Sequence, residues 1–72
     1  MVVTKKIPSV VALHRLHQLS FSVPEEVQVR MKDGSRTASA KSPMGLFSLD
    51  YSLPVEIVTD SAAVLAELEA WR

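Results

Sequence analysis

Two histidines carry the most reactive side chains of this sequence, and their spacing raises the question of catalysis or metal binding. His14 and His17 stand three residues apart, which places two imidazoles near one another on a helix. A metal site needs three or four ligands, and neither a third ligand nor a helper carboxylate stands nearby in the chain. We therefore predict surface histidines, with His14 pointing outward, and neither a metal nor a cofactor.

A serine at position 42 opens a second segment of chemical interest. Ser42 has the residue type of a helix N-cap, whose hydroxyl accepts a hydrogen bond from an amide one turn on. Pro43 suits the first helical position, where its missing N–H costs nothing. The predicted helix ends near Asp50 and carries four apolar side chains: Met44, Leu46, Phe47 and Leu49. A helix this short is unstable alone, so it must pack on the domain, and part of its apolar surface is then available to a partner.

The composition predicts one small domain, residues 1–72. Eight basic residues balance eight acidic ones, whereas a nucleic-acid surface would show a basic excess. The absence of cysteine excludes disulfides and fits a reducing compartment. No stretch resembles a signal peptide or approaches the roughly 20 apolar residues of a membrane span. We expect a cytoplasmic protein that binds neither nucleic acid nor membrane.

Hydrophobic periodicity predicts the elements that position these residues. A β-prone run at residues 2–4 is followed by an amphipathic helix that starts at residues 8–9 and ends at about Ser20. Residues 53–59 are predicted to form a strand with two inward side chains, Val55 and Ile57. Asp60 or Ser61 is predicted to cap the last helix. The predicted buried stripe of this helix consists of Val64, Leu65, Leu68 and Trp71.

A hairpin around residues 33–34 is the clearest local signal. Residues 27–32 alternate apolar and polar, as a half-buried strand does. Asp33 and Gly34 form the pair favoured by a two-residue type I′ turn, which needs positive φ at both positions. Folding the chain there sets Val29 opposite Ala38. One face then holds Val27, Val29, Ala38 and Ala40, and the other holds Gln28, Arg30, Thr37 and Ser39.

The predicted order is β-α-β-β-α-β-α. One sheet face carries small apolar residues, and three amphipathic helices need a surface to cover. A single four-stranded antiparallel sheet with the helices on one face satisfies both requirements and leaves the other face in water. The predicted fold class is therefore α+β, an open-faced sandwich.

This order, together with the segment Ala-Lys-Ser-Pro-Met-Gly-Leu-Phe-Ser-Leu at residues 40–49, resembles HPr. HPr is the small phosphocarrier of the bacterial phosphoenolpyruvate:sugar phosphotransferase system. The family has a Lys-Ser-Ile-Met-Gly-(Val/Leu)-Met-Ser-Leu segment at its second helix, so Pro43 stands for the isoleucine and Phe47 for the second methionine. The likeness covers residues 27–58, and the family's Asn/Asp-Gly-type hairpin turn precedes the segment by the same short spacing. The resemblance implies an HPr-like fold.

The likeness fails at the reactive centre of the family. The phosphoacceptor histidine of HPr lies in a Gly-x-His-Ala-Arg-Pro segment ahead of the first helix. Residues 3–8 stand there in this chain, with Lys5 in place of the histidine and Ile7 in place of the arginine, and only Pro8 is kept. Lysine is cationic at neutral pH and a poor phosphoryl acceptor, and isoleucine binds no phosphate. The expected domain has therefore lost phosphotransfer and is not an enzyme component.

The resemblance also implies a regulatory role for Ser42. In Gram-positive HPr the corresponding serine is phosphorylated, and the catabolite-repression homologue of HPr lacks the histidine and keeps only that serine. We expect a protein-binding module, regulated at Ser42, that contacts a phosphotransferase-system enzyme, a kinase or a transcriptional regulator. The predicted partner contacts are Lys41, Met44, Leu46 and Phe47. Three alternatives stay open: Ser42 as a plain cap, a structural or homo-oligomeric module on the same scaffold, and an active carrier with an atypical acceptor such as His14.

Overall fold

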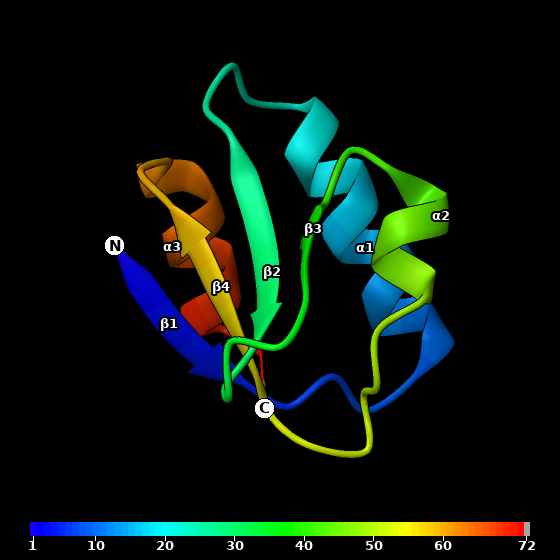
Figure 1. The fold of residues 1–72 in the computed structure, drawn as a ribbon. Helices are drawn as coiled ribbons and strands as arrows, with labels where there is room; N and C mark the ends of the chain where they lie inside the picture. Colours follow the sequence, from blue (N-terminus) through cyan, green and yellow to red (C-terminus); the bar gives the residue numbers. More distant parts are fainter. Residues whose placement is uncertain (72) are drawn as a thin grey trace.

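The computed structural model describes residues 1–71, which form four strands and three helices (Figure 1). In chain order the elements are β1 (Val2–Lys5), α1 (Val10–Phe21), β2 (Val27–Met31), β3 (Thr37–Ser39), α2 (Pro43–Phe47), β4 (Val55–Thr59) and α3 (Ala62–Glu69). The strands form one sheet in the order β1-β4-β2-β3, and every neighbouring pair is antiparallel. The predicted α+β class and four-stranded antiparallel sheet are confirmed. None of the described helices has the length and apolar character needed to cross a bilayer.

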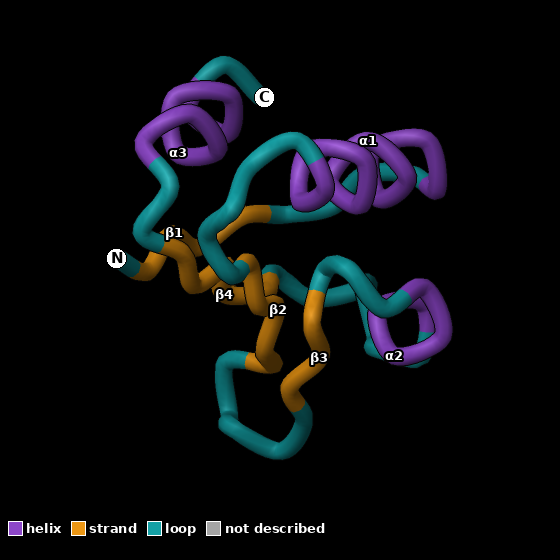
Figure 2. Tube along the Cα trace, turned by 90° about the horizontal axis from the view of Figure 1, so that it is seen from above, coloured by secondary structure: helices purple, strands orange, loops and turns teal. Residues whose placement is uncertain are grey.

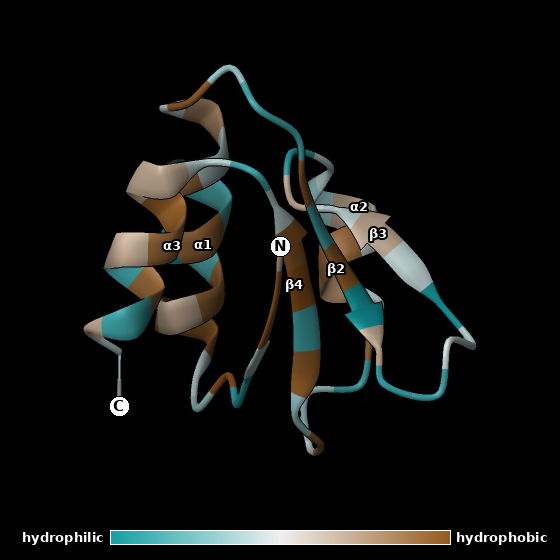
Figure 3. Cartoon of the chain, turned by 90° about the vertical axis from the view of Figure 1, so that its left-hand side faces the viewer, coloured by the Kyte–Doolittle hydropathy of each residue, from teal (hydrophilic) through white to brown (hydrophobic). Residues whose placement is uncertain are grey.

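The core lies between the central strands and the helices α1 and α3, which cover the same face of the sheet (Figure 2). Burial alternates from residue to residue along β4, where a hydrophilic position interrupts the hydrophobic ones (Figure 3). Its apolar residues Val55 and Ile57 are fully buried, as predicted. The helix α1 contributes Leu13 and Leu16 to the core, and α3 contributes Val64 and Leu68. The helix α2 packs beside β3, at the end of the sheet far from β1 (Figure 1).

Serine residues are the N-caps of the two longer helices, α1 and α3. Ser9 Oγ accepts the Ala12 N–H at 3.2 Å, and Ser61 Oγ accepts the Val64 N–H at 3.2 Å. Each bond satisfies one of the amides that a first helical turn leaves without a partner. Of the two caps predicted for the last helix, the structure uses Ser61.

The hairpin has the predicted register but a different turn. Val29 pairs with Ala38, as expected, yet Gly34 alone among residues 1–71 has a positive φ, so the predicted type I′ turn is wrong. The Gly34 N–H donates to the Met31 carbonyl at 2.9 Å, and residues 32–35 form a four-residue loop. Asp33 Oδ1 accepts the Ser35 N–H at 2.9 Å, and hydrogen bonds from the side chain and backbone of Ser35 lower the pKa of Asp33. An aspartate that bonds its own chain two residues on stabilises this wider loop. The predicted two-residue turn and the observed four-residue loop have the same centre, between residues 33 and 34. The strand register is therefore the same in both cases.

The helix α2 is shorter than predicted and ends at Phe47 instead of near Asp50. The N–H and the hydroxyl of Ser48 both bond the Gly45 carbonyl, at 3.2 and 2.7 Å, which closes the last turn. Asp50 Oδ1 then accepts the Ser52 N–H and hydroxyl, and these bonds lower the pKa of Asp50. A serine and an aspartate that bond nearby backbone groups in this way favour turns over continued helix.

A tyrosine joins α2 to the connection that leads into β4. The Tyr51 hydroxyl donates to the Leu46 carbonyl, and burial raises the pKa of Tyr51 from its ordinary value of 10 to about 12. The folded state therefore favours the neutral phenol. The stability linked to the neutral Tyr51 phenol is fully present below pH 10, the ordinary pKa. It is lost as the pH rises through about 12, the pKa in the folded state.

We expect the unfolding midpoint to fall between pH 10 and pH 12 more steeply for the natural chain than for Tyr51→Phe. Phenylalanine keeps the ring and has no proton to lose, so the variant is the matched control. Urea titrations at half-unit pH intervals measure the difference. Parallel pH profiles for the two proteins would show that the tyrosine hydroxyl is not involved.

Candidate functional site

An exposed apolar surface lies where α1 and α2 meet. We call it the α1/α2 surface and define it by Val11, His14, Met44 and Phe47. Met44 is 87% exposed, Val11 77% and Phe47 39%. The His14 and Phe47 rings join the two helices, with centroids 5.1 Å apart and planes tilted by 57°. Apolar side chains gathered on one exposed surface in this way are typical of a contact site for another molecule.

Helical spacing explains which side chains reach this surface. His14 follows Val11 by three residues and Phe47 follows Met44 by three, so each pair lies on one side of its helix. Leu46 points to the other side of α2 and is fully buried in the core. The prediction that Leu46 contacts a partner is therefore wrong, because its side chain is not accessible.

Gly45 lies where α2 packs against β3. A Cβ atom at this position would lie 3.4 Å from Ala38 Cβ of β3 and 3.5 Å from Ser42 Oγ. These distances are close to ordinary van der Waals contacts, so α2 packs directly on the last strand and a methyl group at this position would still fit. The close approach fixes Leu46 in the core and turns Met44 and Phe47 outward.

The helices that form this surface carry no acidic residue. Arg15 lies beside Val11 and His14, and its Nε is 3.6 Å from Glu67 Oε1 of α3, a pair in which both side chains are exposed. Lys41, half-buried, precedes α2. The apolar residues are thus bordered by cations, and a partner surface with carboxylates near its apolar contacts would complement them.

Ser42 occupies the N-cap position of α2 but does not cap it with its side chain. Its hydroxyl makes no bond to the helix, so the predicted capping bond is wrong. The backbone holds the residue instead, because its N–H donates to the Ser39 carbonyl at 3.0 Å and its own carbonyl accepts the Leu46 N–H at 2.9 Å. The exposed hydroxyl faces the Cα of Gly45, where a side chain is absent. It is therefore not tied to the helix by a capping bond.

We expect Ser61→Ala to lower the free energy of unfolding by about 0.5–2 kcal/mol, because it removes a buried cap. The matched substitution Ser42→Ala should change it by less than about 0.5 kcal/mol, because no side-chain bond is lost. Urea unfolding of both variants measures the two effects. Equal losses would mean that the Ser42 hydroxyl does cap α2 in solution.

Residues 3–8, which the resemblance sets against the phosphoacceptor segment of HPr, include side chains that serve the fold. Ile7 is buried in the core, and Lys5 Nζ donates to the Trp71 carbonyl at 3.1 Å. Pro8 is exposed and leads directly into Ser9, the cap of α1. An apolar anchor and a lysine bound to a carbonyl therefore occupy this position, and neither is arranged to hold a phosphoryl group.

The two histidines have different surroundings. His14 is exposed, as predicted, whereas His17 is half-buried and its Nδ1 lies 2.7 Å from the Ala40 carbonyl. A carbonyl oxygen only accepts, so Nδ1 carries the proton. His17 therefore connects α1 to the residue before Lys41. No local pattern in the sequence predicts this contact, which joins residues 23 positions apart. Among residues 1–71, no group of three metal-ligating side chains could hold an ion.

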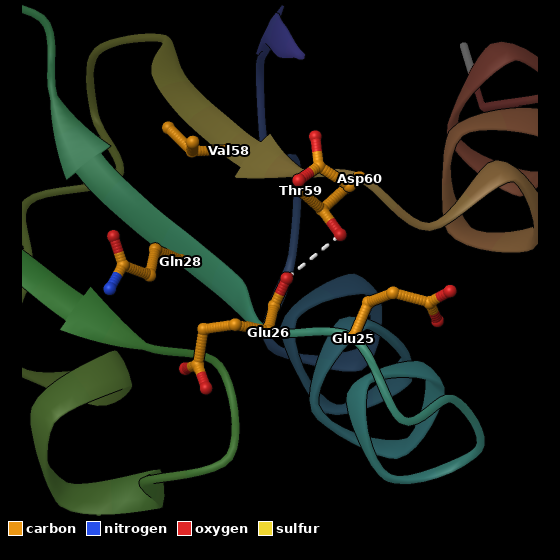
Figure 4. A pocket seen from close by; sticks show the side chains of 6 residues that line it. All are labelled: Glu25, Glu26, Gln28, Val58, Thr59 and Asp60. Atoms are coloured by element: carbon orange, nitrogen blue, oxygen red, sulfur yellow. Dashed lines mark hydrogen bonds between the residues drawn. The ribbon is translucent and has the colours of Figure 1, made fainter.

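A separate hollow at one end of the sheet is lined by several acidic side chains. They are not arranged as a reactive site. Glu25, Glu26 and Asp60 line the hollow, and their carboxylates point in different directions (Figure 4). The Thr59 hydroxyl donates to the Glu26 carbonyl at 2.9 Å and accepts the Ser61 N–H at 3.1 Å. These bonds join the loop before β2 to the cap of α3, so the polar groups at this end support the fold.

Comparisons of the chain with protein-family models, curated proteins and solved structures gave no match.

Proposed function

We propose that this chain is an HPr-like domain without phosphotransfer that acts by binding another protein, under the control of phosphorylation at Ser42. The sequence likeness at residues 40–49 supports the scaffold, and so does the four-stranded antiparallel sheet with its helices. The placement of Ile7 and Lys5 supports the loss of phosphotransfer, because both are engaged in structural contacts.

The observation that carries the proposal is an exposed serine hydroxyl, free of any cap bond, beside an exposed apolar surface. A phosphate on Ser42 would add nearly two negative charges next to Lys41 and two residues from Met44. This charge would offset the positive charges of Lys41 and Arg15, so the border of the α1/α2 surface would lose its cationic character. A partner with carboxylates near its apolar contacts would then bind the phosphorylated form more weakly.

The first experiment is phosphorylation with two donors. With ATP and the serine kinase of the phosphotransferase system, we expect one phosphate on the natural chain and none on Ser42→Ala, by intact-mass spectrometry. With phosphoenolpyruvate and the general phosphotransferase enzyme, we expect no phosphohistidine. Modification of Ser42→Ala by the kinase would contradict the assignment of the site.

Phosphohistidine formation would overturn the loss of phosphotransfer and favour the carrier alternative. His14→Gln and His17→Gln would then identify the acceptor. Calorimetric titration of a catabolite-repression regulator with both forms of the chain tests the switch itself. Equal affinities of the two forms would contradict regulation at Ser42.

A further inference from the structure

The two edges of the sheet differ in how well they are protected. The β3 edge is flanked by α2, and the Ser39 carbonyl already accepts the Ser42 N–H at 3.0 Å. The β1 edge is the outermost strand on the other side, and no element of residues 1–71 lies beyond it (Figure 2). An uncovered edge presents unpaired amide and carbonyl groups and is ready to pair with another strand.

The hydrogen bonds at Met1 show which groups of β1 are free. Met1 and Thr59 exchange both main-chain bonds, each at 3.0 Å. In an antiparallel pair, bonded and non-bonded positions alternate, so Val3 and Lys5 also turn their N–H and C=O groups toward β4. The N–H and C=O groups of Val2 and Thr4 therefore point away from the sheet.

The side chains of this edge lack the features that discourage pairing. The edge contains three β-branched, uncharged residues: Val2, Val3 and Thr4. The ammonium group of Lys5 does not point outward, because it donates to the Trp71 carbonyl. The edge has neither a proline nor an outward charge between residues 2 and 4. It is thus a short but regular pairing template.

Charges at the two ends of the edge select the partner. Lys6 follows β1 at one end and is exposed, and it forms no salt bridge within the described part of the chain. Asp60 follows β4 at the other end, where its carboxylate is 92% exposed and lies 3.2 Å from the Met1 nitrogen. A second copy that runs antiparallel places its Lys6 at the end of the edge that holds Asp60 of the first copy. Lys6 of the first copy then lies at the end that holds Asp60 of the second. The edge is therefore self-complementary in charge as well as in hydrogen bonds.

We propose that β1 is a self-association edge, through which two copies of this chain pair antiparallel and join their sheets into one. The two-fold axis passes through Val3, so that Val2 of each copy exchanges main-chain bonds with Thr4 of the other. This register uses the outward groups of both residues and keeps the helices of both copies on the same side of the joined sheet. It leaves the α1/α2 surface free, so it goes beyond the proposed function and does not depend on it.

Thr4→Pro is the sharpest test. Proline removes only an N–H that points away from β4, which an edge strand tolerates. Thr37→Pro is the matched control, because Thr37 lies between bonded positions of β3 and its N–H also points outward, at the opposite edge. By sedimentation equilibrium we expect a monomer–dimer equilibrium for the natural chain, a dissociation constant raised about tenfold or more by Thr4→Pro, and no change for Thr37→Pro.

Charge reversal gives a second test that does not depend on the proline variants folding. Lys6→Glu or Asp60→Lys alone should weaken the dimer several-fold, and the double variant should restore it. Amide exchange supplies the location, because protection of the Val2 and Thr4 amides should rise with protein concentration. A monomer at all concentrations would overturn the proposal. A dimer unaffected by Thr4→Pro, or one that Phe47→Ala alone dissociates, would overturn it as well.

Discussion

Replacing Leu16 with alanine is expected to lower the free energy of unfolding by about 2–5 kcal/mol. Leu16 lies in the middle of α1, has no exposed surface and belongs to the single core between helices and sheet. The substitution removes the transfer free energy of its methyl groups and leaves a cavity that a small domain fills poorly. Urea unfolding followed by circular dichroism measures the loss.

The effect should be a large part of the total stability. Typical domains are stable by about 0.05–0.15 kcal/mol per residue, which gives about 4–11 kcal/mol for 72 residues. Val11→Ala is the control, because it removes an aliphatic side chain from the same helix at a position that is 77% exposed. Its cost should stay below about 0.5 kcal/mol. Equal costs for the two variants would mean that α1 does not pack on the sheet as described.

Much of the fold follows from short-range patterns in the sequence. The alternation at residues 27–32 predicts β2, and turn residues at 33–34 predict the centre of the hairpin. Together they predict that Val29 pairs with Ala38, which the structure confirms. Each signal acts within a few residues of the chain, so each can be recognised without knowledge of the rest of the molecule.

The features that sequence reasoning missed depend on competition between local bonds. Asp33 and Asp50 each bond a serine two residues on, and Ser48 bonds the Gly45 carbonyl. These bonds widen the hairpin loop and shorten α2. Serine and aspartate are compatible with several turns, so their residue type alone does not say which bond forms.

The candidate site was predicted in part for a similar reason. The apolar cluster after Ser42 predicts a contact surface, and Met44 and Phe47 are indeed exposed. A five-residue helix has too few positions for its periodicity to show which side faces the core, so the burial of Leu46 was missed. The contact of His17 with Ala40 joins residues 23 positions apart and has no local signal.

Met44→Ala should weaken binding to the protein partner about tenfold or more while leaving stability unchanged within about 0.5 kcal/mol. Met44 is 87% exposed, so its loss creates no cavity in the free protein, and a flexible thioether is well suited to fill an irregular pocket of a partner. The measurement is calorimetric titration of the regulator that distinguishes the two Ser42 forms, paired with urea unfolding. Leu53→Ala is the matched surface control, because Leu53 is 57% exposed and lies before β4, outside the α1/α2 surface.

Leu46→Ala tests the second role of α2, which is its contribution to the stability of the core. Its side chain is fully buried, so the variant should lose about 2–5 kcal/mol of stability, and any loss of binding should follow the unfolded fraction. Two residues of one short helix would then affect different properties: Met44 the affinity and Leu46 the stability. If Met44→Ala binds as well as the natural chain while Leu53→Ala binds more weakly, the contact surface does not lie on α1 and α2. The buried side of α2 keeps the exposed side in place, so binding requires both, but only the exposed side should contact the partner.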